Sequence, residues 1–193
     1  CGVQARTQLQ AVCTVRTIKR GWVYNRTPTK AEVFVAEMRG QGTIPSDLLV
    51  AASPKQALDG ADIVCTATTS VSPVFNGGDL KPGTHINAVG AFTPEMQEVD
   101  TDTIRRALVF VDSRESVLAE AGDLIAPIRA GVVGTDHIHA ELGEIVAGVK
   151  LGRTTPEQIT YFKSCGVAVQ DVAAAQIALA ESERLGLGTM VSV

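Results

Sequence analysis

The start of the chain has the residue types that could bind a pyrophosphate. Gly2-Val3-Gln4-Ala5 opens a predicted helix, and a glycine one position before Cys1 would complete the pattern G-x-G-x-x-A. Glycine lets the backbone come close to a phosphate, while the helix N-terminus offers free N–H groups and a partial positive charge. A tight turn with close packing would have the same local sequence, so this segment alone decides little.

A second segment, Asn25-Arg26-Thr27, follows the next predicted strand, about 20 residues further along. Dinucleotide-binding proteins that prefer NAD place an acidic residue there, on the ribose 2′-hydroxyl. An Arg guanidinium and a Thr hydroxyl would instead bind a 2′-phosphate through charge-assisted hydrogen bonds. The segment therefore favours NADPH over NADH, with NADH still possible. The alternative is that Arg26 is only a solvated loop residue.

Two further segments follow predicted strands and consist of small or hydroxyl-bearing residues. They are Thr66-Ala67-Thr68-Thr69-Ser70 and Asn87-Ala88-Val89-Gly90-Ala91. Ligands of open α/β sheets bind at the carboxyl ends of the strands, where such residues let a ribose and a nicotinamide ring lie close to the backbone. Ordinary turns between a strand and a loop remain the alternative.

Other chemistry has weaker support in the sequence. His137 and His139, with Glu141 and Glu144, suggest a metal site, but side chains two apart on a helix diverge and no third ligand is evident. We therefore predict no metal. No Ser or Cys lies in a recognisable nucleophile motif. The cysteines lie far apart without a C-x-x-C pair, which indicates free thiols of a reducing compartment; they are Cys1, Cys13, Cys65 and Cys165.

The elements that would position these residues alternate between short apolar runs and helical patterns. Strands are predicted at 22–25, 48–51, 63–66, 85–89 and 108–111, and helices at 4–18, 28–39, 54–58, 140–146 and 169–185. Nearly continuous apolar runs are typical of strands buried on both faces of a parallel sheet. The sequence predicts an α/β fold with a doubly wound parallel sheet, a Rossmann-like NAD(P)-binding domain, followed by a helical C-terminal segment. No strand is predicted after Val111.

Composition narrows the class of protein. The chain has 193 residues, of which 45% are hydrophobic and 20% charged, as is usual for a globular domain. A net charge of -4 without a basic run argues against nucleic acid as a partner. No apolar run approaches the roughly 20 residues that cross a bilayer, and no signal peptide is evident. We expect a cytoplasmic protein whose N-terminus is truncated.

Six segments together resemble the ornithine cyclodeaminase and mu-crystallin family of NAD(P)-dependent proteins, in the order found in that family. They are Gly2-Val3-Gln4-Ala5-Arg6, Asn25-Arg26-Thr27, 83–91 (GTHINAVGA), Val111-Asp112-Ser113, 140–144 (AELGE) and 162–171 (FKSCGVAVQD). The resemblance implies that residues 1–150 form a Rossmann-like domain lacking its first strand. Residues 151–193 would be a helical segment that packs on an absent N-terminal domain for substrate binding and dimerisation, so a homodimer is expected.

The resemblance also assigns cofactor-binding residues. Gly2, Val3, Gln4 and Ala5 would hold the pyrophosphate, and Asn25, Arg26 and Thr27 would hold the adenosine ribose with its 2′-phosphate. The middle of the cofactor would lie against Thr68, Thr69 and Ser70, and the nicotinamide near Val89, Ala91 and Ser164.

Phe92 distinguishes activities within the family. Cyclodeaminases carry an acidic residue at this position, and Phe92 cannot activate water or an amine. The Phe92-Thr93-Pro94-Glu95-Met96 segment resembles the ketimine-reductase branch. We therefore expect NADPH-dependent reduction of a small cyclic imino acid, Δ1-pyrroline-2-carboxylate to proline or a related ketimine, with Phe92 near the substrate and no catalytic residue assigned. The alternatives are an ornithine cyclodeaminase, an alanine dehydrogenase, and a non-catalytic NADPH-dependent binding protein.

Overall fold

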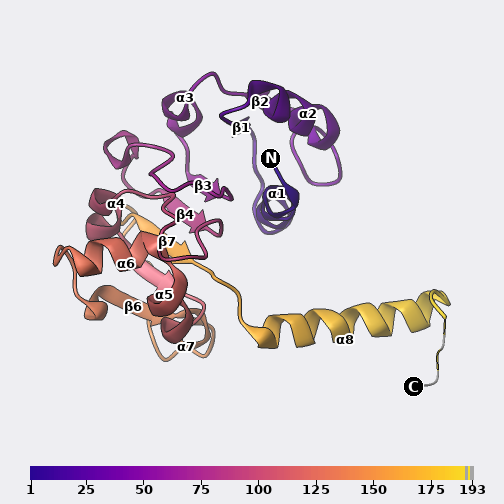
Figure 1. Ribbon diagram of the computed structural model, residues 1–193. Helices are drawn as coiled ribbons and strands as arrows, with labels where there is room; N and C mark the ends of the chain where they lie inside the picture. The colour runs from indigo at the N-terminus through magenta and orange to yellow at the C-terminus, as the bar shows by residue number, and fades with distance from the viewer. Residues whose placement is uncertain (190, 192–193) are drawn as a thin grey trace.

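The computed structural model describes residues 1–189 and 191 and has seven parallel strands in two sheets. The larger sheet has the order β3-β4-β7-β5-β6, and every neighbouring pair in it is parallel. Its strands are β3 (Ile63–Thr66), β4 (His85–Ala88), β5 (Leu108–Val111), β6 (Ile138–Glu141) and β7 (Thr160–Lys163). Helices flank this sheet (Figure 1), so the predicted parallel α/β fold is confirmed.

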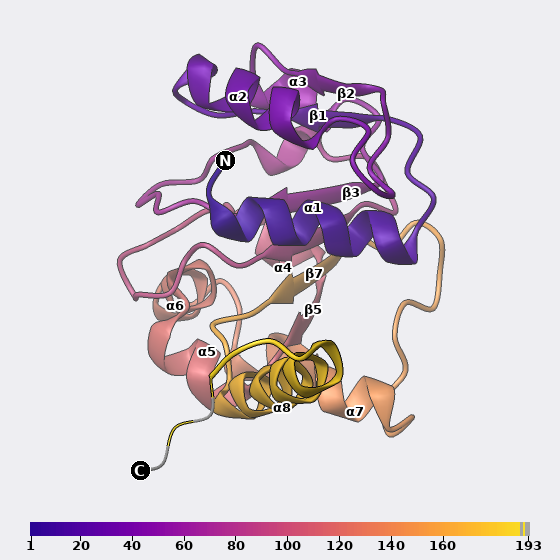
Figure 2. The same cartoon turned by 90° about the vertical axis from the view of Figure 1, so that its right-hand side faces the viewer.

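The smaller sheet pairs β1 (Gly21–Val23) with β2 (Leu48–Val50), also in parallel. Figure 2 shows this sheet above β3, which is the edge strand of the larger sheet, with helix α1 (Val3–Val15) lying in front of β3. Among the described residues, no strand pairs β1 with β3. The predicted sheet is therefore present in two separate parts.

Each sheet has its own hydrophobic core. In the smaller unit, α1 and α2 (Pro28–Met38) enclose a cluster that includes Cys13, Phe34 and Leu48. The larger core lies between the five strands and the helices α4 (Thr101–Arg106), α5 (Arg114–Glu120) and α6 (Gly122–Arg129). Short helices α3 (Pro54–Leu58) and α7 (Leu142–Val146), and 3-10 turns at Gly77–Asp79 and Thr135–His137, complete the connections.

Local sequence explains where several helices begin. Pro28 and Pro54 occupy first-turn positions, where their missing N–H groups cost no hydrogen bond. The side chains of Ser53, Asp100 and Ser113 accept hydrogen bonds from backbone N–H groups in the first turn of α3, α4 and α5. These caps fix the loops that enter the helices.

The structure corrects several expected boundaries. The prediction that no strand follows Val111 is wrong, because β6 and β7 both do, and β7 is the middle strand of the larger sheet. The helix expected over 140–146 begins only at Leu142, since the preceding residues belong to β6. The first helix ends at Val15 rather than residue 18, and Gly21, expected to end it, begins β1.

The last helix, α8 (Ala168–Leu185), extends away from both sheets (Figure 1), and none of its residues is buried. Its stretch Val172-Ala173-Ala174-Ala175 and the neighbouring Ile177 and Leu179 are apolar yet exposed. Within the described part of the chain, no helix has the length and apolar character that a membrane span requires.

Candidate active site at the carboxyl ends of the strands

The predicted site residues follow strands β1, β3, β4 and β7, except for Gly2-Val3-Gln4-Ala5, which open helix α1. Within each parallel sheet, the segments that follow its strands lie at one edge, where open α/β folds bind ligands. The geometry of each segment shows what it could hold there.

The N-terminus of α1 is open to a ligand. Gly2 is the N-cap residue, and a β-carbon placed on it would have no neighbouring atom within 4 Å. The protein itself therefore leaves space at Gly2, beside the first-turn N–H groups that a helix cannot satisfy internally. One turn further, Arg6 forms an ion pair with Glu37 and lies 5.4 Å above the Phe34 ring centroid, which anchors α1 on α2.

The segment after β1 presents positively charged and hydroxyl groups at the start of α2. The Thr27 N–H donates to Asn25 Oδ1 at 2.9 Å, and the Thr27 side chain makes no capping bond although it is the N-cap residue. Arg26 and Thr27 are exposed. Both the guanidinium and the hydroxyl are thus available to an anion.

Lys30 is a residue that the sequence argument missed in this region. Lys30 lies in the first turn of α2, where its N–H donates to the Thr27 carbonyl at 3.0 Å, and it is exposed. It therefore adds a second positive charge beside Arg26 at the start of α2. A lysine three residues after an Asn-Arg-Thr segment was the available sequence clue.

The loop after β3 is tied into the protein by its backbone. The Thr68 N–H donates to Glu98 Oε1 at 2.5 Å, and Thr68 Oγ1 accepts the Ser70 N–H at 3.2 Å. Thr68 and Thr69 are exposed, whereas Ser70 is half-buried and donates its hydroxyl to the Ser72 carbonyl at 2.6 Å. This loop therefore presents hydroxyl groups from a fixed backbone.

The loop after β4 packs directly against the loop after β3. The Val89 N–H donates to the Thr66 carbonyl, and the Gly90 N–H donates to Glu98 Oε2 at 2.8 Å. A β-carbon on Gly90 would overlap both the Thr68 backbone and the Glu98 carboxylate, so this position requires glycine. Ala91, which follows, is fully buried.

Phe92 is half exposed, with 50% relative accessibility, immediately after the buried Ala91. The turn that follows it is clamped by α6: the Gly122 N–H donates to the Thr93 carbonyl, and a β-carbon on Gly122 would overlap the Met96 carbonyl oxygen. The Phe92 ring is therefore presented at the surface from a constrained turn. It can offer apolar contact but no proton.

The segment after β7 is held by Asp112, at the end of β5. Asp112 Oδ2 accepts the Ser164 hydroxyl at 2.8 Å, the Cys165 N–H at 3.0 Å and the Gly166 N–H at 2.8 Å. The Ser164 N–H also donates to the Ala88 carbonyl, which brings Ser164 to the end of β4, near Val89. Asp112 lay inside a quoted motif, but its role as an anchor was not predicted.

A buried polar cluster lies behind these loops. Asp123 Oδ1 accepts the Glu98 and Val99 N–H groups, while Asp123 Oδ2 accepts the Tyr161 hydroxyl at 3.1 Å and lies 3.7 Å from Lys163 Nζ. Burial raises the pKa of Asp123, and the Lys163 charge acts in the opposite direction. Burial and the Asp123 charge raise the pKa of Tyr161 well above its usual value. Sequence reasoning missed the cluster because charged residues are usually expected at the surface.

The two histidines considered as metal ligands each contact a different backbone carbonyl. His137 Nε2 lies 2.7 Å from the Ile104 carbonyl oxygen, and His139 Nε2 lies 2.8 Å from that of Leu151. His139 lies on β6 rather than on a helix. No group of three or more metal-ligating side chains was found among the described residues.

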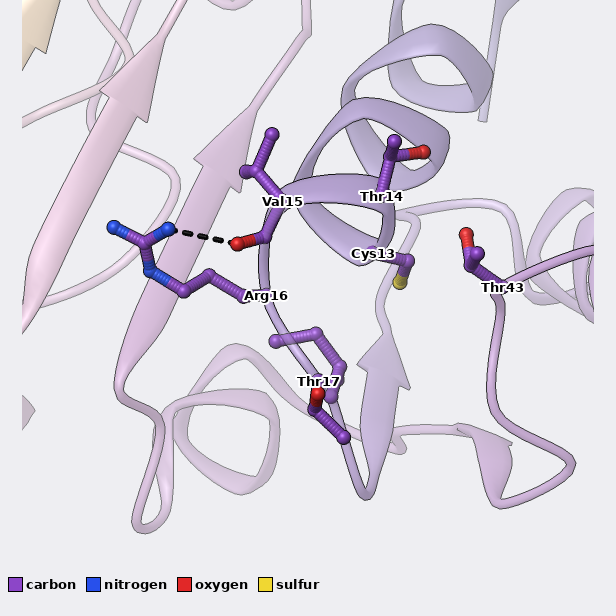
Figure 3. A pocket seen from close by; sticks show the side chains of 7 residues that line it. Cys13, Thr14, Val15, Arg16, Thr17 and Thr43 are labelled. Atoms are coloured by element: carbon purple, nitrogen blue, oxygen red, sulfur yellow. Dashed lines mark hydrogen bonds between the residues drawn. The ribbon is translucent and has the colours of Figure 1, made fainter.

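A hollow of about 360 Å³ lies at the C-terminal end of α1 (Figure 3), lined by Cys13, Thr14, Val15, Arg16, Thr17, Ile18 and Thr43. Arg16 extends away from Cys13 and Thr43, and it donates to the Val15 carbonyl at 2.7 Å. It is at the opposite end of α1 from Gly2. The hollow is therefore separate from the candidate site.

The profile of the ornithine cyclodeaminase/mu-crystallin family matches residues 1–183. The chain belongs to this family. A Δ1-pyrroline-2-carboxylate reductase of Bacillus cereus is 41% identical over 191 residues, which are 98% of this chain and 58% of that protein. The ketimine reductase mu-crystallin of Mus musculus is 39% identical over 176 residues, 91% of this chain and 51% of the relative.

A solved structure has the same fold over nearly the whole of this chain. The Thermococcus litoralis Δ1-pyrroline-2-carboxylate reductase, in complex with NADH and L-proline, superposes with a TM-score of 0.94 at 45% identity. The match covers 98% of this chain and 58% of that one. This chain thus spans less than two thirds of the relatives it matches. The family membership predicted from the six sequence segments is confirmed.

Proposed function

We propose that the protein reduces a small cyclic imino acid with NADPH, converting Δ1-pyrroline-2-carboxylate to proline or acting on a related ketimine. The observation that carries the proposal is the set of groups presented at the helix start and the strand ends. An open glycine begins α1, hydroxyl-bearing residues follow β1, β3 and β7, and the apolar Phe92 stands where a deaminase needs an acid. Both relatives named above, from Bacillus cereus and Mus musculus, are imine reductases by name.

The residues fit a dinucleotide. The open position at Gly2 and the first turn of α1 suit the pyrophosphate, and Asn25, Arg26 and Thr27 suit the adenosine ribose and its 2′-phosphate. Thr68, Thr69 and Ser70 suit the central part of the cofactor, and Val89, Ala91 and Ser164 the nicotinamide end. NADPH is favoured because Arg26 and Lys30 are cationic and no acidic residue occupies 25–27.

Reduction of a protonated imine requires little acid–base catalysis from the residues of this chain. When bound, the reduced cofactor supplies a hydride for the carbon of a C=N bond, and the nitrogen gains a proton. A protonated imine is already electrophilic, so the protein chiefly has to orient the reactants and exclude competing water. Phe92 would pack against the substrate ring, and the rigid turn behind it would keep that contact in place.

The test is a steady-state assay of the protein that carries this chain, with Δ1-pyrroline-2-carboxylate and either NADPH or NADH. We expect oxidation of the cofactor with formation of proline, and a higher kcat/KM for NADPH. Ammonia release from ornithine or alanine would instead indicate a cyclodeaminase or an alanine dehydrogenase. Cofactor binding without turnover of any imino acid would indicate a non-catalytic binding protein.

We also propose that α8 packs on a further domain of the whole protein, within a homodimer. An 18-residue helix whose apolar residues are all exposed would be stabilised by such a contact. An additional strand between β1 and β3 would join the two sheets into one doubly wound sheet. The four free cysteines support a reducing, cytoplasmic location. Limited proteolysis and sedimentation of the whole protein test the packing of α8 and the dimer.

A further inference from the structure

Glu98 is a fully buried acidic residue whose carboxylate faces two loops of the candidate site. Oε1 accepts the Thr68 N–H at 2.5 Å, and Oε2 accepts the Gly90 N–H at 2.8 Å and the Thr66 hydroxyl at 2.9 Å. Thr66 and Thr68 belong to the end of β3 and its loop, and Gly90 belongs to the loop after β4. One carboxylate therefore joins the ends of two neighbouring strands.

The backbone of Glu98 is fixed from the other side. Its N–H donates to Asp123 Oδ1 at 2.6 Å, and the other oxygen of Asp123 meets Tyr161 and Lys163 of β7. Ser164 directly follows Lys163. The position of Glu98 is therefore linked to a third strand whose end carries a predicted nicotinamide-proximal residue.

Stability alone is a poor explanation for a buried carboxylate here. Moving a charge out of water is costly, and apolar residues of similar volume often stabilise a core as well or better. The two backbone N–H groups that donate hydrogen bonds to the Glu98 carboxylate belong to loops with predicted cofactor contacts. Gly90 also lacks a side chain where one would collide with this carboxylate and with the Thr68 backbone. The contact between the two loops therefore depends on a glycine at position 90 and on the buried carboxylate of Glu98.

We propose that Glu98 is a positioning residue that fixes the loops after β3 and β4 relative to one another and thereby sets where the nicotinamide half of the cofactor lies. The nicotinamide part of this inference rests on the proposed function. The connection between the two loops does not, because it concerns hydrogen bonds within the chain.

Glu98→Gln gives the sharpest test. A glutamine has one acceptor oxygen, so its NH2 group must face either the Thr68 N–H or the Gly90 N–H, and one loop loses its acceptor. We expect protection against hydrogen exchange at Thr68 or Gly90 to fall about tenfold or more, with the amides of β5 unchanged. A uniform loss of protection over the domain would overturn the proposal, because it would show a general structural role.

Thr66→Val is the matched comparison. It removes one buried donor to the same carboxylate but leaves both backbone hydrogen bonds to the loops. We expect Thr68 and Gly90 to keep their protection in this variant; equal loss in both variants would overturn the proposal. If Glu98→Gln folds poorly, Glu98→Asp takes its place, since it keeps the charge but withdraws the carboxylate from the loops.

Binding in the whole protein tests the cofactor half of the inference. We expect Glu98→Gln to raise the dissociation constant of NADPH about tenfold or more while leaving that of 2′-phospho-ADP-ribose, which lacks the nicotinamide riboside, unchanged. Glu120→Gln, an exposed carboxylate at the end of α5, is the control and should change neither. Equal weakening of both ligands would overturn the role in positioning. Failure of the wild type to bind either ligand would overturn the proposed function instead, and the exchange experiment would still decide whether Glu98 holds the loops.

Discussion

The two parts of the candidate site are built by different physical means. Beside the smaller sheet, the groups available to a ligand are exposed side chains and helix N-termini, with Arg26 and Thr27 as the main examples. Beside the larger sheet, the loops are held from behind by the buried carboxylates of Glu98 and Asp123 and the half-buried carboxylate of Asp112. The first part can attract a charged group, whereas the second fixes geometry.

This difference has energetic consequences. Exposed charges are screened by salt, so binding of a 2′-phosphate by Arg26 should weaken as ionic strength rises. Buried hydrogen bonds are shielded from salt, and removing one partner leaves the other unsatisfied at full desolvation cost. Substitutions in the larger sheet should therefore lower stability or distort loops, while those beside the smaller sheet should change affinity alone.

The largest effect is expected from Asp123→Asn. Lys163 is 0% exposed, its Nζ has no hydrogen-bond partner, and Asp123 is its ion-pair partner. Loss of that negative charge leaves a buried ammonium uncompensated, which typically costs about 3–5 kcal/mol. We expect the free energy of unfolding, measured with urea, to fall by this amount.

Asp47→Asn is the control for that experiment, because Asp47 pairs with Arg20 at the surface. Exposed pairs contribute about 1 kcal/mol or less. Equal destabilisation by the two substitutions would contradict the distinction between buried and exposed charges.

Arg26→Glu should produce the largest change in binding. It replaces a cation with an acidic residue at the position where NAD-preferring proteins carry one. We expect NADPH to bind roughly 100-fold more weakly, with NADH affected much less and the melting temperature unchanged. Isothermal titration at two salt concentrations measures this. Arg16→Glu, at the far end of α1, should alter neither cofactor, and a similar loss there would point to a nonspecific charge effect.

The features that can be predicted from the sequence also differ from those that cannot in how local their cause is. The segment 25–27 could be proposed from the sequence because its chemistry depends on residue type and on distance from a strand. The strands β1 to β5 were predicted correctly, since continuous apolar runs such as Leu108–Val111 directly reflect burial. Local pattern was sufficient for these strands.

What escaped prediction depends on contacts between distant segments. Strand β7 contains Thr160 and Lys163 and owes its central place to pairing with β4 and β5, which lie far away in sequence. Likewise, Glu98 and Asp123 are ordinary surface residue types until folding places backbone donors around them. Only three-dimensional pairing reveals these roles.

Asp112→Asn should have an intermediate, local effect. A single oxygen of Asp112 accepts three hydrogen bonds from 164–166, and an amide in its place would be a weaker acceptor or present donors to these groups. We expect about 1–3 kcal/mol of local destabilisation, seen as faster hydrogen exchange at Cys165 and Gly166. Unchanged exchange at these two amides would show that Asp112 does not anchor the segment leading to α8.

The smallest effect is expected in the reactivity of Cys165. Burial raises the pKa of its thiol to about 11; the nearby Lys163 charge opposes the rise, and the Asp112 charge adds to it. Only the thiolate reacts, so the rate of alkylation by iodoacetamide should still be rising above about pH 10, where an ordinary exposed thiol has levelled off. Asp112→Asn removes a negative charge and should move the profile of Cys165 to lower pH. Mass spectrometry of the Cys165 peptide measures the rate. A profile with its midpoint near pH 8.5 in the wild type would mean that the loop after β7 is as accessible as the exposed segments beside the smaller sheet.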